Sequence, residues 1–371
     1  MAKLGDIATY INGYAFKPQD WSDEGIPIIR IQDLTGNSYQ ANRYNGEYAS
    51  KYEVNDGDVL ISWSASLGVY IWHGEKAVLN QHIFKVVFDK ERISKDFFVH
   101  QVGLILENAA SDAHGATMKH LTKPVFDALP FYLPPYEKQC EIAEVLDKVT
   151  SLISLRKQQL AKLDELVKAR FVEMFGDPVV NSKRWPVETI ENHIDLLTGF
   201  PFDSSGYVSK GVNICGGLII MPQKIDWSAC KHWPKITGYE DYILRPNDIV
   251  IALDRPWISN GFKIAMVDRE HLPALLIQRT ARIRAVDINQ HYLMQSLLLG
   301  RFDKHCNITG SLVPHISPKD IKSYSVMLPP IELQNQFATF VERVDQQKQT
   351  VQQSLEKLEL MKKVLMQEYF G

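Results

Sequence analysis

Two long stretches of the chain carry apolar residues in alternating steps of four and three. Neither Pro nor Gly interrupts the first stretch, whose repeating positions are Ile142, Leu146, Val149, Ile153, Arg156, Leu160, Leu163, Val167, Arg170 and Met174. The second stretch repeats the pattern at Phe337, Val341, Val344, Lys348, Val351, Leu355, Leu358, Lys362, Leu365 and Tyr369. A seam sustained over about four heptads predicts coiled-coil helices, although helices that pack only on their own domains stay an alternative. At about 1.5 Å per residue, residues 137–174 would form a rod of roughly 57 Å.

The second stretch is a copy of the first, and the copy extends beyond the helices. At a constant offset of 195 residues the chain repeats Gly115, His120, Leu133-Pro134-Pro135, Glu137, Gln139 and Phe175-Gly176 as Gly310, His315, Leu328-Pro329-Pro330, Glu332, Gln334 and Phe370-Gly371. Upstream the offset drifts, with residues 11–16 resembling 197–202 and residues 58–61 resembling 248–251. A period this long is not that of a solenoid or propeller. The sequence therefore predicts one module present twice, which can do one thing at two places.

The repeat predicts the domain organisation. Each helix follows Leu-Pro-Pro and opens with acidic residues, which suit the positive N-terminus of a helix. We expect a first domain over residues 1–135, a helix over 136–177, a second domain over 178–331 and a helix over 332–371. Two such helices pair most economically as an antiparallel coiled coil with the domains at opposite ends. That arrangement has an internal pseudo-two-fold axis, as in a symmetric dimer.

The two domains are predicted to be mixed, which makes the fold class α+β. In the first domain we expect strands over residues 28–31, 58–61, 69–72 and 83–87 and a helix over 95–107. In the second domain we expect strands over residues 217–221, 248–252, 263–267 and 279–285 and a helix over 291–300. Short strands with long polar connections indicate compact sheets whose loops do the binding.

Composition and charge narrow the classes of function. The chain has 371 residues, of which 45% are hydrophobic and 23% charged, and this suits two globular domains. We expect a cytoplasmic protein, because the chain shows no signal peptide and no apolar run of the roughly 18 to 20 residues that span a membrane. Residues 1–135 hold 12 Lys and Arg against 16 Asp and Glu, whereas residues 178–331 hold 17 against 14. Any binding of nucleic acid must therefore use local basic faces.

A shared element precedes each long helix, in residues 115–124 and 310–319. Thr122 and Ser317 are suitable N-caps, each close to a Pro at the start of a short helix. The small residues after Gly115 and Gly310 would let the backbone approach a phosphate. The neighbouring cations are Lys119, His120, Lys123, His315 and Lys319. The plainer alternative, a loop and cap that only lead into the helix, stays open because one element can serve both purposes.

Motifs of catalysis are incomplete. Leu133-Pro134-Pro135-Tyr136 is similar to the Asn-Pro-Pro-Tyr run of amino-methyltransferases, but Leu cannot hold the target amine through a side-chain oxygen. Asp303, Asp320 and Lys322 loosely match the acidic sites of metal-dependent nucleases. Because Asp320 lies three residues after Ser317, a capping box explains it better. The cysteine and histidine spacings match no metal site, so we expect no catalytic residue, no metal and no cofactor.

With its duplicated domains, each followed by Leu-Pro-Pro, Glu-x-Gln and a heptad helix, the whole chain resembles the specificity subunit of bacterial type I restriction-modification enzymes. The resemblance implies a non-catalytic subunit that reads a two-part site in double-stranded DNA. It also implies that the chain docks two methyltransferase subunits, which motor-endonuclease subunits later join, with no membrane involved. The recognition domains of the family resemble the DNA-reading domain of adenine methyltransferases. Catalysis would then belong to another subunit, which flips the adenine out of the duplex.

DNA-binding residues are expected in loops rich in polar and aromatic side chains. Arg and Gln can each make paired hydrogen bonds to a base edge, worth roughly 1 to 3 kcal/mol. In the first domain the candidates are Tyr14, Lys17, Trp63, Ser64, Gln81, His82, Gly115, Lys119 and His120. In the second domain they are Phe200, Asp254, Arg255, Trp257, Gln278, Arg279, Gly310, His315 and Lys319.

Two alternatives belong to other classes of protein. A standalone metal-dependent DNA nuclease would use Asp303, Asp320 and Lys322 and would cleave DNA as a purified chain. A coiled-coil scaffold with two protein-binding heads would show no sequence-selective retention of DNA.

Overall fold

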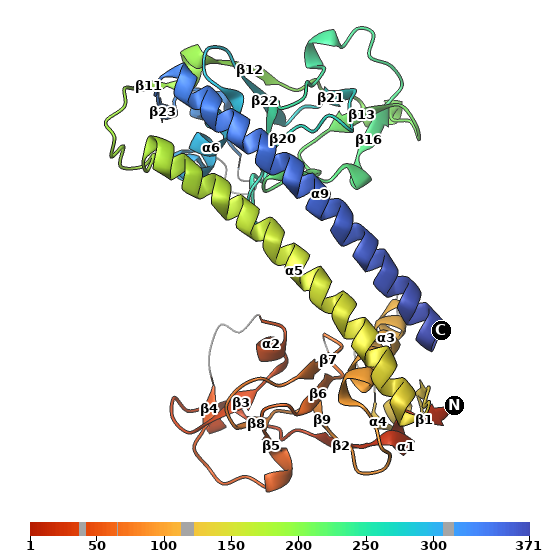
Figure 1. Cartoon of the computed structure of the whole chain (residues 1–371). Helices are drawn as coiled ribbons and strands as arrows, with labels where there is room; N and C mark the ends of the chain where they lie inside the picture. The colour runs from red at the N-terminus through yellow and green to blue at the C-terminus, as the bar shows by residue number, and fades with distance from the viewer. Residues whose placement is uncertain (37–41, 65, 113–121, 307–314) are drawn as a thin grey trace. The chain divides into compact units, whose positions relative to one another are not determined.

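The computed structural model describes residues 1–36, 42–64, 66–112, 122–306 and 315–371, and the chain divides into two compact units. Unit 1 comprises Met1–Lys157 and Gln353–Gly371, and unit 2 comprises Gln158–Gln352. Two helices of 40 residues each, α5 (Tyr136–Phe175) and α9 (Ile331–Phe370), contribute one part to each unit (Figure 1). The two long helices predicted from the heptad seam are therefore confirmed.

Unit 1 is built on two sheets of four strands each. The first has the order β2 (Thr9–Asn12), β9 (Ile83–Val87), β6 (Val59–Ser62) and β7 (Gly68–Ile71), all antiparallel. The second has the order β4 (Arg43–Tyr44), β3 (Ile26–Ile29), β8 (Ala77–Leu79) and β5 (Glu53–Val54), with β3 and β8 parallel. A third, two-stranded pairing joins β1 (Ala2–Lys3) to β10 (Pro130–Phe131).

Three helices complete the core of the first sheet of unit 1: α1 (Leu4–Ile7), α3 (Lys95–Asp112) and α4 (Lys123–Asp127). A fourth, α2 (Ile31–Leu34), packs in a second cluster with residues of β3, β5 and β8. Four phenylalanines from α3, α4 and β10 are fully buried, namely Phe97, Phe98, Phe126 and Phe131. Burying such large rings is the main source of stability available to a domain of this size.

Unit 2 repeats the topology with its own strands. The four-stranded sheet has the order β12 (Ile194–Thr198), β22 (Thr280–Ala285), β17 (Ile249–Ala252) and β20 (Ile264–Met266). A second sheet has the order β16 (Lys231–Trp233), β13 (Val212–Cys215) and β21 (Ala274–Leu276), with β13 and β21 parallel. Strands β11 (Val187–Thr189) and β23 (Ser325–Met327) pair as β1 and β10 do. The repeat in the sequence is therefore a repeat of strand order.

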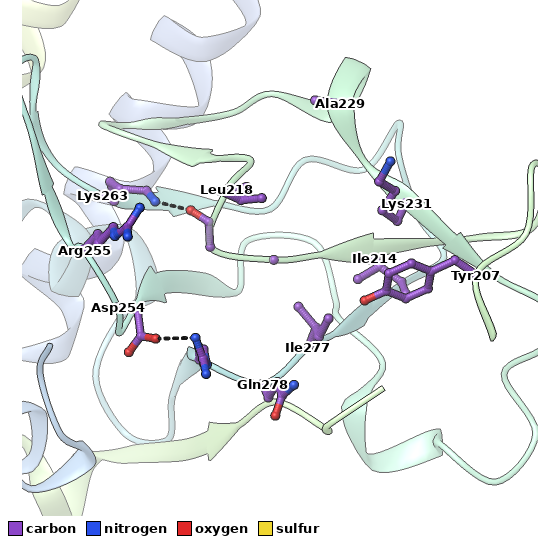
Figure 2. A pocket seen from close by; sticks show the side chains of 13 residues that line it. Tyr207, Ile214, Leu218, Ala229, Lys231, Asp254, Arg255, Lys263, Ile277 and Gln278 are labelled. Atoms are coloured by element: carbon purple, nitrogen blue, oxygen red, sulfur yellow. Dashed lines mark hydrogen bonds and ion pairs between the residues drawn. The ribbon is translucent and has the colours of Figure 1, made fainter. Parts of the chain in front are cut away.

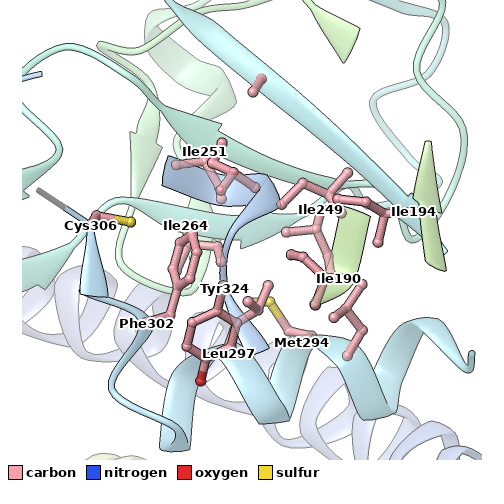
Figure 3. Close-up of a cluster of buried hydrophobic side chains, with 14 of the residues drawn as sticks. Ile190, Ile194, Ile249, Ile251, Ile264, Met294, Leu297, Phe302, Cys306 and Tyr324 are labelled. Carbon is pink, nitrogen blue, oxygen red and sulfur yellow. The ribbon is translucent and has the colours of Figure 1, made fainter. Parts of the chain in front are cut away.

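The helices of unit 2 close the core shown in Figure 3. They are α6 (Gln290–Leu299), α7 (Phe302–His305) and α8 (Pro318–Lys322). Met294 and Leu297 of α6 pack with Phe302 of α7 against Ile249 and Ile251 of the central strand. Two hairpins, β14 (Ile220–Met221) with β15 (Lys224–Ile225) and β18 (Trp257–Ile258) with β19 (Gly261–Phe262), complete the unit.

Most of the predicted elements are present, and two are placed differently. The segment 217–221 was predicted as a strand, but Ile219 and Ile220 both donate their N–H groups to the carbonyl of Gly216, so most of it is a turn. The strand predicted over 28–31 ends at Ile29, because Asp33 accepts a hydrogen bond from the N–H of Arg30 at 2.8 Å and starts α2. A backbone turn accounts for the first difference and a side-chain capping interaction for the second.

The heptad positions form the contact between α5 and α9 inside each unit. In unit 1, Arg156 donates from Nε to Ser354 Oγ at 3.2 Å, and Lys157 pairs with Glu359 at 2.9 Å. The seam positions are buried or half-buried along both helices, whereas Leu152, Leu155 and Leu166 outside the seam are exposed. The seam predicted from the spacing is thus the buried face.

Unit 2 shows the direction in which the helices pass each other. Lys348 of α9 forms an ion pair with Asp164 of α5, and the ring of Phe337 lies 5.5 Å from that of Phe171. From the first of these contacts to the second, the residue number rises in α5 and falls in α9, so the two helices run antiparallel within this unit. The ends also pack on the domain, because Phe171 stacks at 5.4 Å on Tyr292 of α6.

The repeated Glu-x-Gln motif has a structural role. Gln139 is 1% exposed; its Oε1 accepts from the N–H of Ser94 at 3.0 Å, and its Nε2 donates to the carbonyl of Pro134 at 2.9 Å. Gln334 does the same in unit 2, with the N–H of Asn289 at 2.9 Å and the carbonyl of Pro329 at 2.8 Å. Each glutamine therefore ties the Leu-Pro-Pro turn to the start of the domain helix, α3 or α6.

We expect Gln334→Ala to lower the free energy of unfolding by about 2 to 4 kcal/mol, because it leaves a buried N–H and a buried carbonyl without partners, at roughly 1 to 3 kcal/mol each. Urea unfolding followed by circular dichroism measures the change. Gln349→Ala, at an exposed position of the same helix, is the control and should change stability by less than about 0.5 kcal/mol. Equal stabilities of the two variants would contradict the role given to Gln334.

Candidate nucleic-acid interface

A network of backbone hydrogen bonds shapes one edge of unit 1, where both of its sheets end. The N–H of Gly13, after β2, donates to the carbonyl of Ile83 at 3.1 Å. The N–H of Tyr14 donates to the carbonyl of Leu79 at 2.8 Å, and the N–H of Gln81 donates to the carbonyl of Tyr14 at 2.8 Å. The first sheet is thereby joined to the end of β8 in the second, and the turn from β8 to β9 is fixed. We call this the turn edge of unit 1.

Unit 2 builds the same edge from the corresponding residues. The N–H of Gly199 donates to the carbonyl of Thr280 at 3.1 Å, and that of Phe200 to the carbonyl of Leu276 at 3.0 Å. The N–H of Gln278 donates to the carbonyl of Phe200 at 2.8 Å. The turn edge therefore occurs twice with one backbone and the same glutamine, whereas the residue after the glutamine differs.

Glycine is required at the start of each turn edge. A Cβ on Gly13 would lie 2.0 Å from the carbonyl oxygen of Asn80, and a Cβ on Gly199 would lie 2.0 Å from that of Ile277. Real Cβ atoms do not approach a backbone oxygen this closely, so any other residue would push the strand end away. This explains why a Gly stands before Tyr14 and before Phe200 in the two copies.

A left-handed residue follows the glutamine in both units. His82 has φ of 74° and Arg279 has φ of 64°, a region that residues other than glycine seldom occupy. The carbonyl of His82 accepts from the N–H of Trp63 at 3.2 Å, and that of Arg279 accepts from the N–H of Leu253 at 2.9 Å. Backbone strain of this kind gathers at functional sites. The same bonds bring the loops after β6 and β17 to the turn edge.

The structure brings together most of the predicted residues of unit 1. The indole of Trp63 donates to Asn12 Oδ1 at 3.2 Å and lies 5.0 Å from the ring of His82. Tyr14 is 45% exposed and Gln81 half-buried, whereas Ser64 is only 5% exposed. These five residues lie on or beside the turn edge.

The other predicted residues of unit 1 are not joined to that group. Lys17 is exposed before a short 3-10 helix, where its N–H donates to Asp20 at 2.7 Å. Gly115, Lys119 and His120 lie outside the described residues, and so does Gly310 of the second copy.

In unit 2 four predicted residues line one cavity of about 600 Å³. They are Asp254, Arg255, Gln278 and Arg279 (Figure 2). Arg279 pairs with Asp254 at 3.2 Å. His315 forms a β-bridge with Asp254, so the element before α8 also reaches this site. A volume of this size is ordinary for a binding cleft.

Three predicted residues of unit 2 lie beside the cavity or away from it. Phe200 packs its ring 5.0 Å from Phe202 in an aromatic cluster, and only its backbone holds Gln278. Trp257 packs on Phe262 at 5.2 Å in the β18–β19 hairpin. Lys319 is exposed on α8. These placements suit structural roles for both aromatic rings.

Sequence reasoning missed three residues that line the cavity: Tyr207, Lys231 and Lys263. Lys263 is 6% exposed, and its Nζ donates to the carbonyl of Gly217. Burial, together with the neighbouring Arg255 guanidinium, lowers the pKa of the Lys263 ammonium. The sequence signal that could have identified Lys263 was its place as a lone cation at the start of the predicted apolar strand 263–267.

The nuclease hypothesis finds no support in the geometry. The Asp320 carboxylate accepts from the N–H of Ser317 at 2.8 Å and from its hydroxyl at 2.7 Å, which makes it the predicted capping box of α8. Lys322 pairs with Glu191 at 3.1 Å. Over the described ranges, no three His, Cys, Asp or Glu side chains gather as metal ligands would.

The two buried thiols, Cys215 and Cys306, are not placed as nucleophiles. Burial raises the pKa of Cys306 to about 12 and also raises that of Cys215. A thiolate is the reactive form of cysteine, so both side chains act as apolar core residues at neutral pH.

In the part of the chain that is described, no helix has the length and apolar character needed to cross a bilayer.

Comparison with known proteins places the chain in a family. The family model described as type I restriction modification DNA specificity domain matches residues 1–165 and 236–360. The MjaVIII specificity subunit of Methanocaldococcus jannaschii is 25% identical over 99% of this chain and 90% of its own length. The EcoBI specificity subunit of Escherichia coli is 25% identical over 92% of this chain and 78% of its own.

Solved structures share the fold. The S subunit of a type I restriction-modification system from M. genitalium superposes with a TM-score of 0.57 at 13% identity, covering 100% of this chain and 95% of that one. A chain from a study of the assembly of a type I system gives a TM-score of 0.53 at 15% identity, covering 100% and 96%. The resemblance inferred from the repeated motifs is confirmed. Because the family model covers well over half of its residues, the chain belongs to the type I restriction modification DNA specificity family.

Proposed function

We propose that the chain is the DNA-reading subunit of a type I restriction-modification complex, and that each unit reads one half of a two-part site. The observation that carries this proposal is the turn edge, built twice on one backbone with different side chains. Duplicated backbone geometry gives two equivalent ways to approach a duplex. Different side chains on it give two different sequences to read. The relatives named specificity subunits support the same function.

Reading would centre on the glutamine of each turn. Gln81 and Gln278 have backbones fixed by hydrogen bonds, which limits the entropy lost when their side chains bind. A glutamine amide can pair with the N6 and N7 edge of adenine in the major groove. The residue after this glutamine is His82 in unit 1 and Arg279 in unit 2. In the loop after the central strand, β6 or β17, the corresponding residues are Ser64 and Asp254. The two half-sites should therefore differ.

The chemistry would be supplied by other subunits. Leu133 stands where a methyltransferase needs an amide or acid to hold the amine, and Asp320 is engaged as a helix cap. We propose that the chain is non-catalytic and holds two modification subunits, with restriction subunits joining the assembly. The exposed positions outside the heptad seam, among them Lys162, Glu165 and Lys363, offer equivalent docking surfaces on α5 and α9.

The long helices would set the gap between the half-sites. We propose domains over residues 1–135 and 178–331, joined by helices over 136–177 and 332–371 in an antiparallel coiled coil with a pseudo-two-fold axis. Helices of 40 residues, each about 60 Å long, are stiff enough for this purpose. Half-buried cations at the seam, such as Arg156 and Lys348, would keep the register.

We expect Gln81→Ala and Gln278→Ala each to relax one half of the recognised sequence, and not the same half. Loss of a paired contact to a base should reduce discrimination by roughly 1 to 3 kcal/mol at that position. Mapping methylated adenines in cells that carry each variant measures this. Gln158→Ala, at an exposed position of α5, is the matched control and should leave the map unchanged. If both variants altered the same half, or removed modification at all sites equally, the proposed division would be wrong.

We also expect that lengthening both helices by one heptad widens the gap between the half-sites. Seven residues of the seam pattern inserted after Lys157 and after Gln352, the borders of the two units, leave the contacts inside each unit intact. They add about 10 Å, or roughly three base pairs of rise. Tilt and bending should absorb part of this, which leaves about one to three base pairs. Methylation mapping that showed the original gap for a folded, lengthened protein would refute the spacer role.

A further inference from the structure

Unit 2 holds a pair of cations in its cavity. Lys263 and Arg255 line the same end of the cavity, next to Gly217 (Figure 2). Among the described residues no carboxylate lies within 4.0 Å of either side chain, whereas Arg279 nearby is paired with Asp254. Burial is the larger cause of the lowered pKa of Lys263, and the nearby Arg255 guanidinium lowers it further because the two positive charges repel each other. An anion between them would remove that repulsion.

The fold holds both cations in place. Lys263 is 6% exposed and uses one of its three N–H donors on the carbonyl of Gly217, so two donors remain. Arg255 is exposed and has φ of 46°. This left-handed backbone conformation costs on the order of a few RT, and such strain is concentrated at functional sites. The N–H of Lys263 donates to the carbonyl of Pro256 at 2.7 Å, which fixes the loop between them. The two charges are therefore brought together by the backbone.

The described residues of unit 1 show no cation at the position of Lys263. Ser62 pairs with Gly68 across β6 and β7, and Ala252 donates to the carbonyl of Lys263 at the corresponding place in unit 2. Gly68 thus occupies the position of Lys263 and has no side chain. The connection from β17 to β20 in unit 2 is also longer, because it contains the β18–β19 hairpin that follows Arg255. In the part of the chain that the structure describes, the cation pair is therefore a feature of unit 2.

We propose that this cavity binds a phosphate group of the DNA backbone beside the half-site that unit 2 reads, and that unit 2 therefore anchors the chain on DNA. A phosphate is a compact anion with several acceptor oxygens, which one ammonium and one guanidinium can share. The inference rests on the proposed function and adds to it a difference between the two halves. Residues 178–331 carry 17 Lys and Arg against 14 Asp and Glu, whereas residues 1–135 carry 12 against 16, which favours the same half.

The proposal gives Arg255 a contact to the backbone, whereas the sequence pattern predicted a contact to a base. The two roles differ in measurable ways. A phosphate contact lowers affinity for every DNA sequence and reduces the dependence of binding on salt, whereas a base contact changes preference at one position. Gln278 and Asp254, at the turn edge, would remain for reading.

The test compares Lys263→Gln and Arg255→Gln in the full chain co-purified with its modification subunits. Dissociation constants for a duplex that contains the methylated site and for an unrelated duplex are measured from about 50 to 200 mM salt. We expect each variant to weaken binding to both duplexes by the same factor. The slope of log affinity against log salt should fall by about 0.9 for the phosphate contact that is lost. Because Arg255 is exposed, Arg255→Gln should fold normally, and it keeps the test decisive if the buried Lys263→Gln variant fails to fold.

Lys224→Gln removes one exposed positive charge of unit 2 outside the cavity and is the matched control. A change in slope no larger than that of the control would overturn the proposal, and so would a loss confined to the methylated site. A wild-type complex that bound neither duplex would instead refute the proposed function itself.

A second measurement separates DNA from free anions. Inorganic phosphate is added to the wild-type complex at constant ionic strength, and melting temperature and DNA binding are followed. We expect inorganic phosphate to compete with DNA only at millimolar concentration, because the cavity would hold just one of the many phosphate groups that the complex contacts along the duplex. Tight phosphate binding that left DNA affinity unchanged would mean that the cavity serves a free anion, and would overturn the assignment to the DNA backbone.

Discussion

The turn edge depends on the close approach of a glycine to a neighbouring backbone carbonyl. Without a Cβ, Gly13 and Gly199 allow the end of a strand to pass over the carbonyl of Asn80 or Ile277. That approach lets the next residue bond to the second sheet and lets the glutamine N–H bond back. The left-handed residue and the loop after the central strand follow from these bonds. The residues that we propose to read bases, Gln81 and Gln278, are positioned by this backbone arrangement.

A second constraint connects each domain to its long helix. The side chains of Gln139 and Gln334 bridge the Leu-Pro-Pro turn and the start of α3 or α6 through two hydrogen bonds each. The direction in which a helix leaves its domain is then fixed by buried polar contacts as well as by apolar packing. Such a joint would allow the loops to diverge while the geometry of the scaffold stays the same. This shared role fits the constant offset of 195 residues between the two Leu-Pro-Pro and Glu-x-Gln motifs, whereas the offset changes within the domains.

The sequence predicted the parts of the fold that rest on periodicity. The heptad spacing predicted both long helices and their buried face, and short runs rich in apolar and β-branched residues predicted β6, β9, β17 and β22. It did not give β8 and β21, and so it missed the parallel pairs β3–β8 and β13–β21, because buried strands of three residues have no visible period. The hydrogen-bond role of Gln139 and the burial of Lys263 also require knowledge of distant partners. Gln278 and Arg279 were predicted as candidates because Arg and Gln in loops can contact base edges, and the structure places both in the lining of one cavity.

The most direct test of a duplicated reader is the exchange of one half. Residues 178–331 are replaced with the same region of a relative that has another specificity, and methylated adenines are mapped in cells that carry the exchanged chain. If each unit reads one half-site, one half of the recognised sequence changes and the other half and the gap persist. If both halves change together in an assembled, active complex, the units read jointly, and the assignment of one half-site to each unit is wrong.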